Sequence, residues 1–194
     1  MTPSATQPLL PSLIPASTTR DIALVVGGSL VVALFAQVTI PLPFVEITGQ
    51  TLGVFLVALA LGSKLGGAAL ILYLLEALVG LPVLAGFKNA WSVSSAGGVP
   101  AIIGPTAGYL LGFVMAAFAV GWLADKGWTR NVLLVSTAML IGTALIYIPG
   151  LLWLSKFTGE KTLEFGLIPF IPGDLIKAAL AAVLLPSAWK LTKR

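Results

Sequence analysis

Six long apolar segments restrict what this chain can fold into more than any other feature of the sequence. Residues 22–40 are apolar on every face, whereas a membrane β-strand alternates apolar and polar positions over about ten residues. An apolar helix of about 20 residues crosses a hydrocarbon core about 30 Å thick and satisfies its own backbone there. We therefore predict an all-α, polytopic membrane protein, a compact bundle of six transmembrane helices at residues 22–40, 50–62, 65–80, 102–124, 131–154 and 174–190.

Composition and the ends of the chain agree with a single membrane domain. Hydrophobic residues make up 58% of the chain and charged residues 9%, against about 25% charged in soluble domains. Residues 1–19 contain four prolines and no charged side chain. We therefore predict a disordered tail over residues 1–20 and one transmembrane domain over residues 21–194.

Glycine and proline mark the expected turns. The second and third segments are short, and Gly62, Lys64 and Gly66 between them predict a tight turn that joins them as a hairpin. Pro105 and Pro149 predict kinks or broken helix ends, because proline removes a backbone donor and clashes with the preceding turn.

The distribution of basic residues predicts the orientation. Positively charged loops stay in the cytoplasm. With the N-terminus inside, seven basic residues are cytoplasmic and three lie outside, so we predict that both termini are cytoplasmic. The inner set is Arg20, Lys64, Lys126, Arg130, Lys190, Lys193 and Arg194, and the outer set is Lys88, Lys156 and Lys161. The outer loops at 41–49, 81–101 and 155–173 are long, which is typical of functional loops.

Missing residue types exclude several functions. The chain has no Cys and no His, so thiolate or imidazole metal sites and the usual nucleophile–base pairs are absent. The net charge of +4 is scattered among membrane segments, which argues against nucleic acid. The sequence has no phosphate-binding loop, so a partner or an ion gradient must supply any energy for transport. We expect a non-enzyme that carries no cofactor or metal.

Charged residues inside the spans are the first candidates for a ligand site. Asp174 and Lys177 are three residues apart at the start of the sixth segment, so they share one helix face. Charges in a membrane segment are costly, and they usually mark function. The alternative is that Asp174 caps the helix while Lys177 extends to the interface. For Glu76, late in the third segment, we favour a structural role or one in which the side chain extends to the interface.

Two aromatic residues have two interpretations each. Tyr109 opens the fourth segment, where it could line a site or belong to the interfacial aromatic belt. Trp91 in the second outer loop could be a ligand platform or an interface anchor.

Small residues recur every fourth position in the first segment. Ala23 with Gly27, and Ser29 with Ala33, would let another helix approach closely. They would serve either as a partner interface or as packing within this chain.

Several motifs together resemble the BioY family, the substrate-binding S components of energy-coupling factor (ECF) biotin transporters. The resemblance covers most of residues 30–185. The motifs are ALFAQ (33–37), PLP (41–43), TGQTL (48–52), GLPVLAG (80–86), GPTAGYLLGF (104–113) and PFIPGDLIK (169–177).

The resemblance implies a fold, a pocket and partners. It implies a compact six-helix protein of the cytoplasmic membrane, with a pocket near the outer face, a gating first loop, and biotin as the ligand. The ligand would be imported with a transmembrane T component and two ATPases, which alone would use ATP, and small residues on the first helix would contact the T component. The resemblance also implies that Asp174 and Lys177 hydrogen-bond the ligand. The further candidate ligand residues are Tyr109, Gln50, Thr48, Lys88, Asn89 and Trp91.

The second outer loop departs from the family pattern, because residues 87–100 are longer than the usual glycine-rich connection. Lys88 or Asn89 is the candidate for the carboxylate end of the ligand. The alternatives are an S component for thiamin or riboflavin, or a structural membrane protein without transport.

Overall fold

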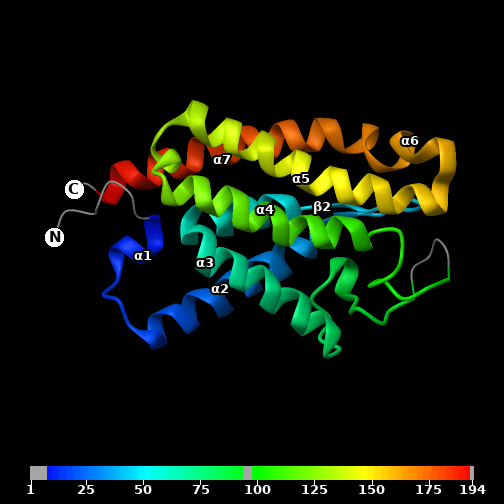
Figure 1. The fold of residues 1–194 in the computed structure, drawn as a ribbon, viewed down its shortest axis with the longest axis horizontal. Helices are drawn as coiled ribbons and strands as arrows, with labels where there is room; N and C mark the ends of the chain where they lie inside the picture. Colours follow the sequence, from blue (N-terminus) through cyan, green and yellow to red (C-terminus); the bar gives the residue numbers. More distant parts are fainter. Residues whose placement is uncertain (1–7, 94–97, 193–194) are drawn as a thin grey trace.

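The computed structural model describes residues 8–93 and 98–192, and it is mostly helical (Figure 1). The α-helices are α1 (Leu9–Leu13), α2 (Thr18–Ala36), α3 (Gln50–Leu78), α4 (Ala107–Asp125), α5 (Val132–Thr158), α6 (Thr162–Gly166) and α7 (Ile171–Thr192). Two short strands, β1 (Thr39–Ile40) and β2 (Ile47–Thr48), pair antiparallel, and the 3-10 turns are η1 (Ala85–Phe87), η2 (Trp128–Arg130), η3 (Gly159–Lys161) and η4 (Ile168–Phe170).

The prediction of a helical membrane protein is confirmed. Within the described residues, four stretches are long and apolar enough to cross a membrane: Thr18–Ala36, Gln50–Leu78, Ala107–Asp125 and Val132–Ala181. The last stretch contains α5 and the first half of α7, which lie side by side in Figure 1.

Helix α3 doubles back on itself at Gly62, as the predicted hairpin requires. Gly62 has φ +81° and ψ −175°, a backbone conformation that residues other than glycine rarely adopt. The second half starts at Ser63, whose backbone N–H and hydroxyl both donate to the carboxylate of Asp125. A Cβ on Gly66 would lie 3.1 Å from the Cα of Ala58, so the two halves pack against each other.

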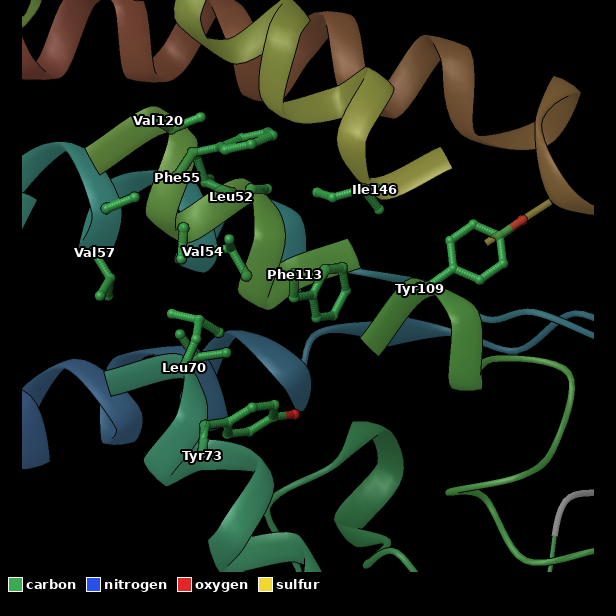
Figure 2. Packing of buried hydrophobic residues seen from close by; sticks show 14 of the residues in the cluster. Leu52, Val54, Phe55, Val57, Leu70, Tyr73, Tyr109, Phe113, Val120 and Ile146 are labelled. Atoms are coloured by element: carbon green, nitrogen blue, oxygen red, sulfur yellow. The ribbon is translucent and has the colours of Figure 1, made fainter. Parts of the chain in front are cut away.

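The chain runs back and forth between two ends of the bundle. The α1 end, at the left of Figure 1, carries α1 and the C-terminal part of α7, and the opposite end carries the β1–β2 loop, η1 and α6. We call the opposite end the pocket end. In the core, side chains from α3, α4 and α5 interdigitate, among them Phe55, Val120 and Ile146 (Figure 2).

The two prolines behave differently from each other. Pro105 lies just before α4, which begins at Ala107, so it marks a helix end as predicted. Pro149 lies inside α5, which continues to Thr158. The carbonyl of Pro149 packs against Gly108 of α4, where an added Cβ would clash with that oxygen.

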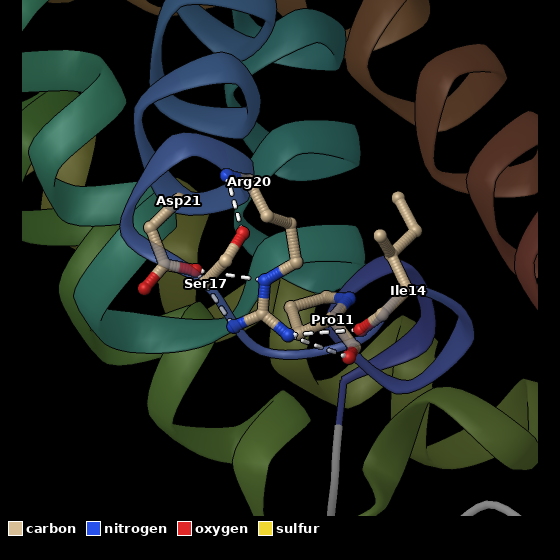
Figure 3. Close-up of polar contacts among 5 residues, drawn as sticks. All are labelled: Pro11, Ile14, Ser17, Arg20 and Asp21. Carbon is tan, nitrogen blue, oxygen red and sulfur yellow. Dashed lines mark hydrogen bonds and ion pairs between the residues drawn. The ribbon is translucent and has the colours of Figure 1, made fainter.

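The prediction of a disordered tail is wrong from Leu9 onward, and residues 1–7 lie outside the described residues. Leu9 is buried in the short helix α1, and Ser17 caps α2 by accepting the N–H of Arg20. The guanidinium of Arg20 donates to the carbonyls of Pro11 and Ile14 at 3.2 and 3.0 Å and pairs with Asp21 (Figure 3). The Pro- and Ser-rich composition favoured disorder, but one buried leucine and the hydrogen bonds from Arg20 to Pro11 and Ile14 order this segment.

Close helix packing predicts a stability difference between two glycines. A Cβ on Gly121 of α4 would lie 2.6 Å from backbone atoms of Gly62 and Ser63, whereas one on Gly27 meets no atom within 4 Å. Gly121→Ala should therefore destabilise the protein by about 1–3 kcal/mol, because backbone cannot yield cheaply. Thermal unfolding in detergent measures this. Gly27→Ala is the matched control, and equal unfolding temperatures for both variants would contradict the packing.

Candidate ligand-binding pocket

A pocket of about 110 Å³ opens at the pocket end of the bundle, between two loops and the helices α3, α4, α5 and α7. The β1–β2 loop and the η1 turn form part of its wall, and the start of α3, α4, α5 and the start of α7 form the rest. Its wall is largely apolar, with aromatic and aliphatic side chains that include Phe44, Leu84, Leu110, Phe113, Ile146 and Phe170. Such a wall with a few polar groups is typical of a small-molecule site.

The first polar group of the pocket centres on Lys177. Its Nζ donates to Thr51 Oγ1 at 2.7 Å and to Asp174 Oδ1 at 3.3 Å, and the hydroxyl of Tyr147 donates to Asp174 Oδ2 at 2.5 Å. The side chains of Lys177 and Asp174 are only 14% and 19% exposed. Lys177, Tyr147 and Thr51 line the pocket. Asp174 lies outside the pocket wall and accepts hydrogen bonds from Lys177 and Tyr147.

This arrangement differs from simple helix capping. Helix α7 begins at Ile171, so Asp174 lies within its first turn rather than before it. Its two carboxylate oxygens are engaged by a phenol from α5 and by an ammonium one turn further along α7. The predicted Asp174–Lys177 pairing is therefore present in the structure, and it is built into the pocket.

Tyr109 lies in the pocket wall and is 7% exposed, so it is not a belt residue. Its hydroxyl donates to the carbonyl of Gly166 at 2.9 Å, and its ring meets the ring of Tyr147 edge to face at 6.0 Å. Figure 2 shows its ring near Phe113 and Ile146. Tyr109 thereby offers the pocket an aromatic surface while its hydroxyl ties α4 to the segment after α5.

Thr48 and Gln50 also line the pocket, and they begin a chain of hydrogen bonds. Thr48 Oγ1 donates to Gln50 Oε1 at 3.0 Å, and Gln50 Nε2 donates to the hydroxyl of Tyr73 at 2.6 Å. The hydroxyl of Tyr73 donates in turn to the carbonyl of Val83 at 3.1 Å. The start of α3 is thus tied to the loop that carries η1.

Lys88 provides the second cation of the pocket. It follows η1, and its Nζ lies 2.6 Å from Glu46 Oε1 in the β1–β2 loop. Both residues line the pocket, and their side chains are 33% and 23% exposed. This ion pair joins the two loops at the pocket mouth.

Asn89 and Trp91 were predicted as ligand residues, but the structure does not bring them into the pocket wall. Asn89 Oδ1 accepts the backbone N–H groups of Trp91 and Ser92, and its amide donates to the carbonyl of Gly80. Trp91 is 59% exposed, and its indole donates to the carbonyl of Leu78. Of the two residues that the sequence offered for the carboxylate end of the ligand, Lys88 lines the pocket, whereas Asn89 orders the loop turn.

The small residues of α2 face different ways. Ala23 and Gly27 are exposed, and Ala33 packs partly against the core. Ser29 is fully buried, and its hydroxyl is hydrogen-bonded to Glu76 Oε1 of α3 at 3.0 Å. Ser29 therefore belongs to internal packing rather than to a partner interface, and Glu76 has the structural contact that we favoured.

Among the pocket residues that the sequence did not single out are Tyr147, Thr51 and Glu46. Tyr147 had a usable signal, because a phenol far inside an apolar helix needs a hydrogen-bond partner. Thr51 lies within the TGQTL motif, but nothing in the sequence pairs it with Lys177. Glu46 lies in the first predicted outer loop, and only the fold brings it to Lys88.

Comparisons with known proteins identify the family of this chain. The family model described as "BioY family" matches residues 6–194. The biotin transporter BioY of Rhizobium etli is 36% identical over 179 residues, covering 86% of this chain and 91% of its own length. That of Thermotoga maritima is 38% identical over 151 residues, covering 77% and 83%.

A solved structure has the same fold. The crystal structure of the S-component for biotin from an ECF-type ABC transporter superposes with a TM-score of 0.71 at 26% identity, covering 93% of this chain and 96% of its own. Because the family model matches nearly the whole chain and these relatives exceed 30% identity over most of it, the chain belongs to the BioY family.

Proposed function

We propose that this protein binds biotin and brings it across the cytoplasmic membrane as the substrate-specific S component of an ECF-type importer. One observation carries the proposal: Lys177, Tyr147 and Thr51 form a polar group, backed by Asp174, at one part of a largely apolar pocket. Its relatives are named biotin transporters, and the matching crystal structure is a biotin S-component.

The polar group fits the ureido ring of biotin. The ammonium of Lys177 and the hydroxyl of Thr51 can donate to the ureido oxygen. Tyr147 gives its own proton to Asp174, so its oxygen is left to accept a ureido N–H. The apolar wall, with Phe113 and Ile146, suits the fused rings and the aliphatic chain.

Lys88 is the proposed partner of the biotin carboxylate. It is a cation at the pocket mouth, on a different loop from Lys177. Glu46 provides a carboxylate for Lys88, so the ligand carboxylate would replace one negative partner with another. A charge-assisted bond of this kind contributes about 1.5–3 kcal/mol.

Transport into cells tests the proposal. The protein is co-expressed with the T component and the two ATPases of its own organism, in a host that has no biotin importer of its own. We expect uptake of labelled biotin but not of labelled thiamin or riboflavin. Uptake of either other vitamin in place of biotin would assign a different S component, and no uptake of any would favour a structural protein.

We further propose that six helical segments cross the membrane: α2, the two halves of α3, α4, α5 and α7, with both termini in the cytoplasm. The break at Gly62 supports the count, since it divides α3 into two antiparallel halves. Basic residues also follow this orientation: Lys126 and Arg130 lie between α4 and α5, and Lys156 and Lys161 lie at the pocket end.

Single cysteines test this orientation without background, because the chain has none. Glu160 and Lys126 are exposed at opposite ends of the bundle. In intact cells, a membrane-impermeant thiol reagent should label Glu160→Cys and spare Lys126→Cys. Labelling of position 126 alone would place the pocket on the cytoplasmic side.

The exposed face of α2 around Ala23 and Gly27 is the proposed docking surface for the T component. A Cβ on Gly27 meets no atom of this chain within 4 Å, so a partner helix can approach closely. The two ATPases would supply the energy, since this chain has no phosphate-binding loop.

A further inference from the structure

Gln37, the residue that follows α2, is hydrogen-bonded through its side chain to the distant loop that contains η1. Its Nε2 donates to the carbonyl of Ala33 at 2.9 Å and faces the carbonyls of Leu84 and Val83 at 3.2 and 3.5 Å. Its Oε1 accepts the backbone N–H of Phe87 at 2.8 Å. One amide side chain thus uses both donor and acceptor to fix a turn nearly 50 residues away.

The turn that Gln37 fixes is held in an unusual shape. Phe87 has φ +57°, and it is the non-glycine residue with positive φ among those the structure describes. The turn closes where Leu84 donates its N–H to the carbonyl of Lys88 at 2.8 Å. A strained residue persists only where its surroundings determine it, and here the N–H of Phe87 is bound by Gln37.

The same turn places Lys88 at the pocket mouth. Leu84 is 5% exposed and anchors the start of the turn in the core, and the carbonyl of Val83 is held from the other side by Tyr73. Lys88 leaves the turn directly after Phe87 and reaches Glu46 at 2.6 Å. The direction of the Lys88 side chain therefore depends on the conformation that Gln37 holds.

We propose that Gln37 is a positioning residue for recognition of the ligand carboxylate, acting through the turn 83–87 on Lys88. The proposal rests on the proposed function, in which Lys88 binds the carboxylate of biotin. Gln37 does not line the pocket, so it touches no ligand itself. Because it ends α2, it also links the proposed docking helix to the pocket mouth.

A double-mutant cycle with two ligands tests this role. Gln37→Met keeps the length of the side chain but removes its donor and acceptor, and Lys88→Met removes the ammonium. Biotin and biotin methyl ester, which lacks the negative charge, are titrated against each purified variant. The control is Thr39→Val, which removes a nearby buried hydroxyl oxygen that has no hydrogen-bond partner in the described part of the chain.

We expect Gln37→Met to weaken biotin binding about tenfold, because a misplaced Lys88 loses one charge-assisted bond to the ligand carboxylate. Binding of the methyl ester should change by less than about twofold, which is the deviation expected between independent sites. In the Lys88→Met background, Gln37→Met should have no further effect, and Thr39→Val should bind both ligands normally. Without ligand, Gln37→Met should also speed amide hydrogen exchange at Leu84 and Phe87.

Two results would overturn the proposal. If Gln37→Met weakens the binding of biotin and of the methyl ester equally, and its effect multiplies with that of Lys88→Met in the double variant, Gln37 is a general structural residue. If the wild-type protein prefers biotin to the methyl ester but Gln37→Met binds biotin as tightly as the wild type does, Gln37 has no role in recognition of the carboxylate. Failure of the wild-type protein to bind biotin at all is a separate outcome that contradicts the proposed function, and the exchange measurement still reports on the turn.

Discussion

Lys177→Met should weaken biotin binding at least about tenfold, because the variant loses a charge-assisted hydrogen bond of about 1.5–3 kcal/mol. Methionine preserves the apolar part of the side chain, so the pocket wall is kept. Equilibrium titration of labelled biotin against the purified variant measures the loss. The control is Lys161→Met, which removes an exposed lysine in η3, outside the pocket wall.

Two further variants show how the polar group works. Asp174→Asn keeps a similar shape but removes the charge that holds Lys177 and Tyr147, so it should also weaken biotin binding about tenfold. Tyr147→Phe keeps the ring and removes the oxygen proposed to accept a ureido N–H. Normal binding by Lys177→Met and Asp174→Asn, with normal expression, would leave the pair as a structural contact between helices.

Gly27→Trp should abolish ATP-dependent uptake while biotin binding to the isolated protein stays normal. The indole would project from the exposed face of α2 and block close approach of the T component, and its Cβ would meet no atom of the neighbouring helices within 4 Å. The measurements are uptake into cells, co-purification with the T component and ATPases, and biotin titration. Loss of uptake, loss of co-purification and unchanged titration together are the expected result.

The neighbouring glycine provides a matched control. A Cβ on Gly28 would lie 2.8 Å from Ala69 and 3.1 Å from Leu61, so Gly28 faces the core. Gly28→Trp should therefore fail to fold rather than fail to dock. If Gly27→Trp transports biotin normally, the partner docks on another surface, and if it cannot bind biotin, this face belongs to the site or the core.

The helical architecture was predictable because membrane physics acts on local sequence. A long apolar run must form a helix when no water is present to satisfy the backbone, so α2, α4 and α5 were recognised within a few residues. The break at Gly62 was predictable too, since glycine and lysine between two apolar runs indicate a turn. Asp174 and Lys177 could be paired because their spacing alone puts them on one face.

The missed features depend on contacts between distant segments. Tyr147 meets Asp174 across 27 positions, and Lys88 meets Glu46 across 42, so no local pattern reveals either pair. Asn89 and Trp91 were predicted from residue type, but local hydrogen bonds turn both away from the pocket. Ser29 shared a small-residue spacing with Ala33, yet the rotation of α2 aims its hydroxyl at Glu76.

Direct binding of labelled biotin to the purified wild-type protein, in detergent and without partners, tests the assignment of the pocket most directly. We expect saturable binding of one biotin per chain, displaced by unlabelled biotin and unaffected by an excess of thiamin or riboflavin. Lys177→Met in the same assay should lose most of that binding. Absence of saturable binding by the well-folded wild-type protein, or displacement by thiamin or riboflavin, would contradict a biotin-binding pocket at this end of the bundle.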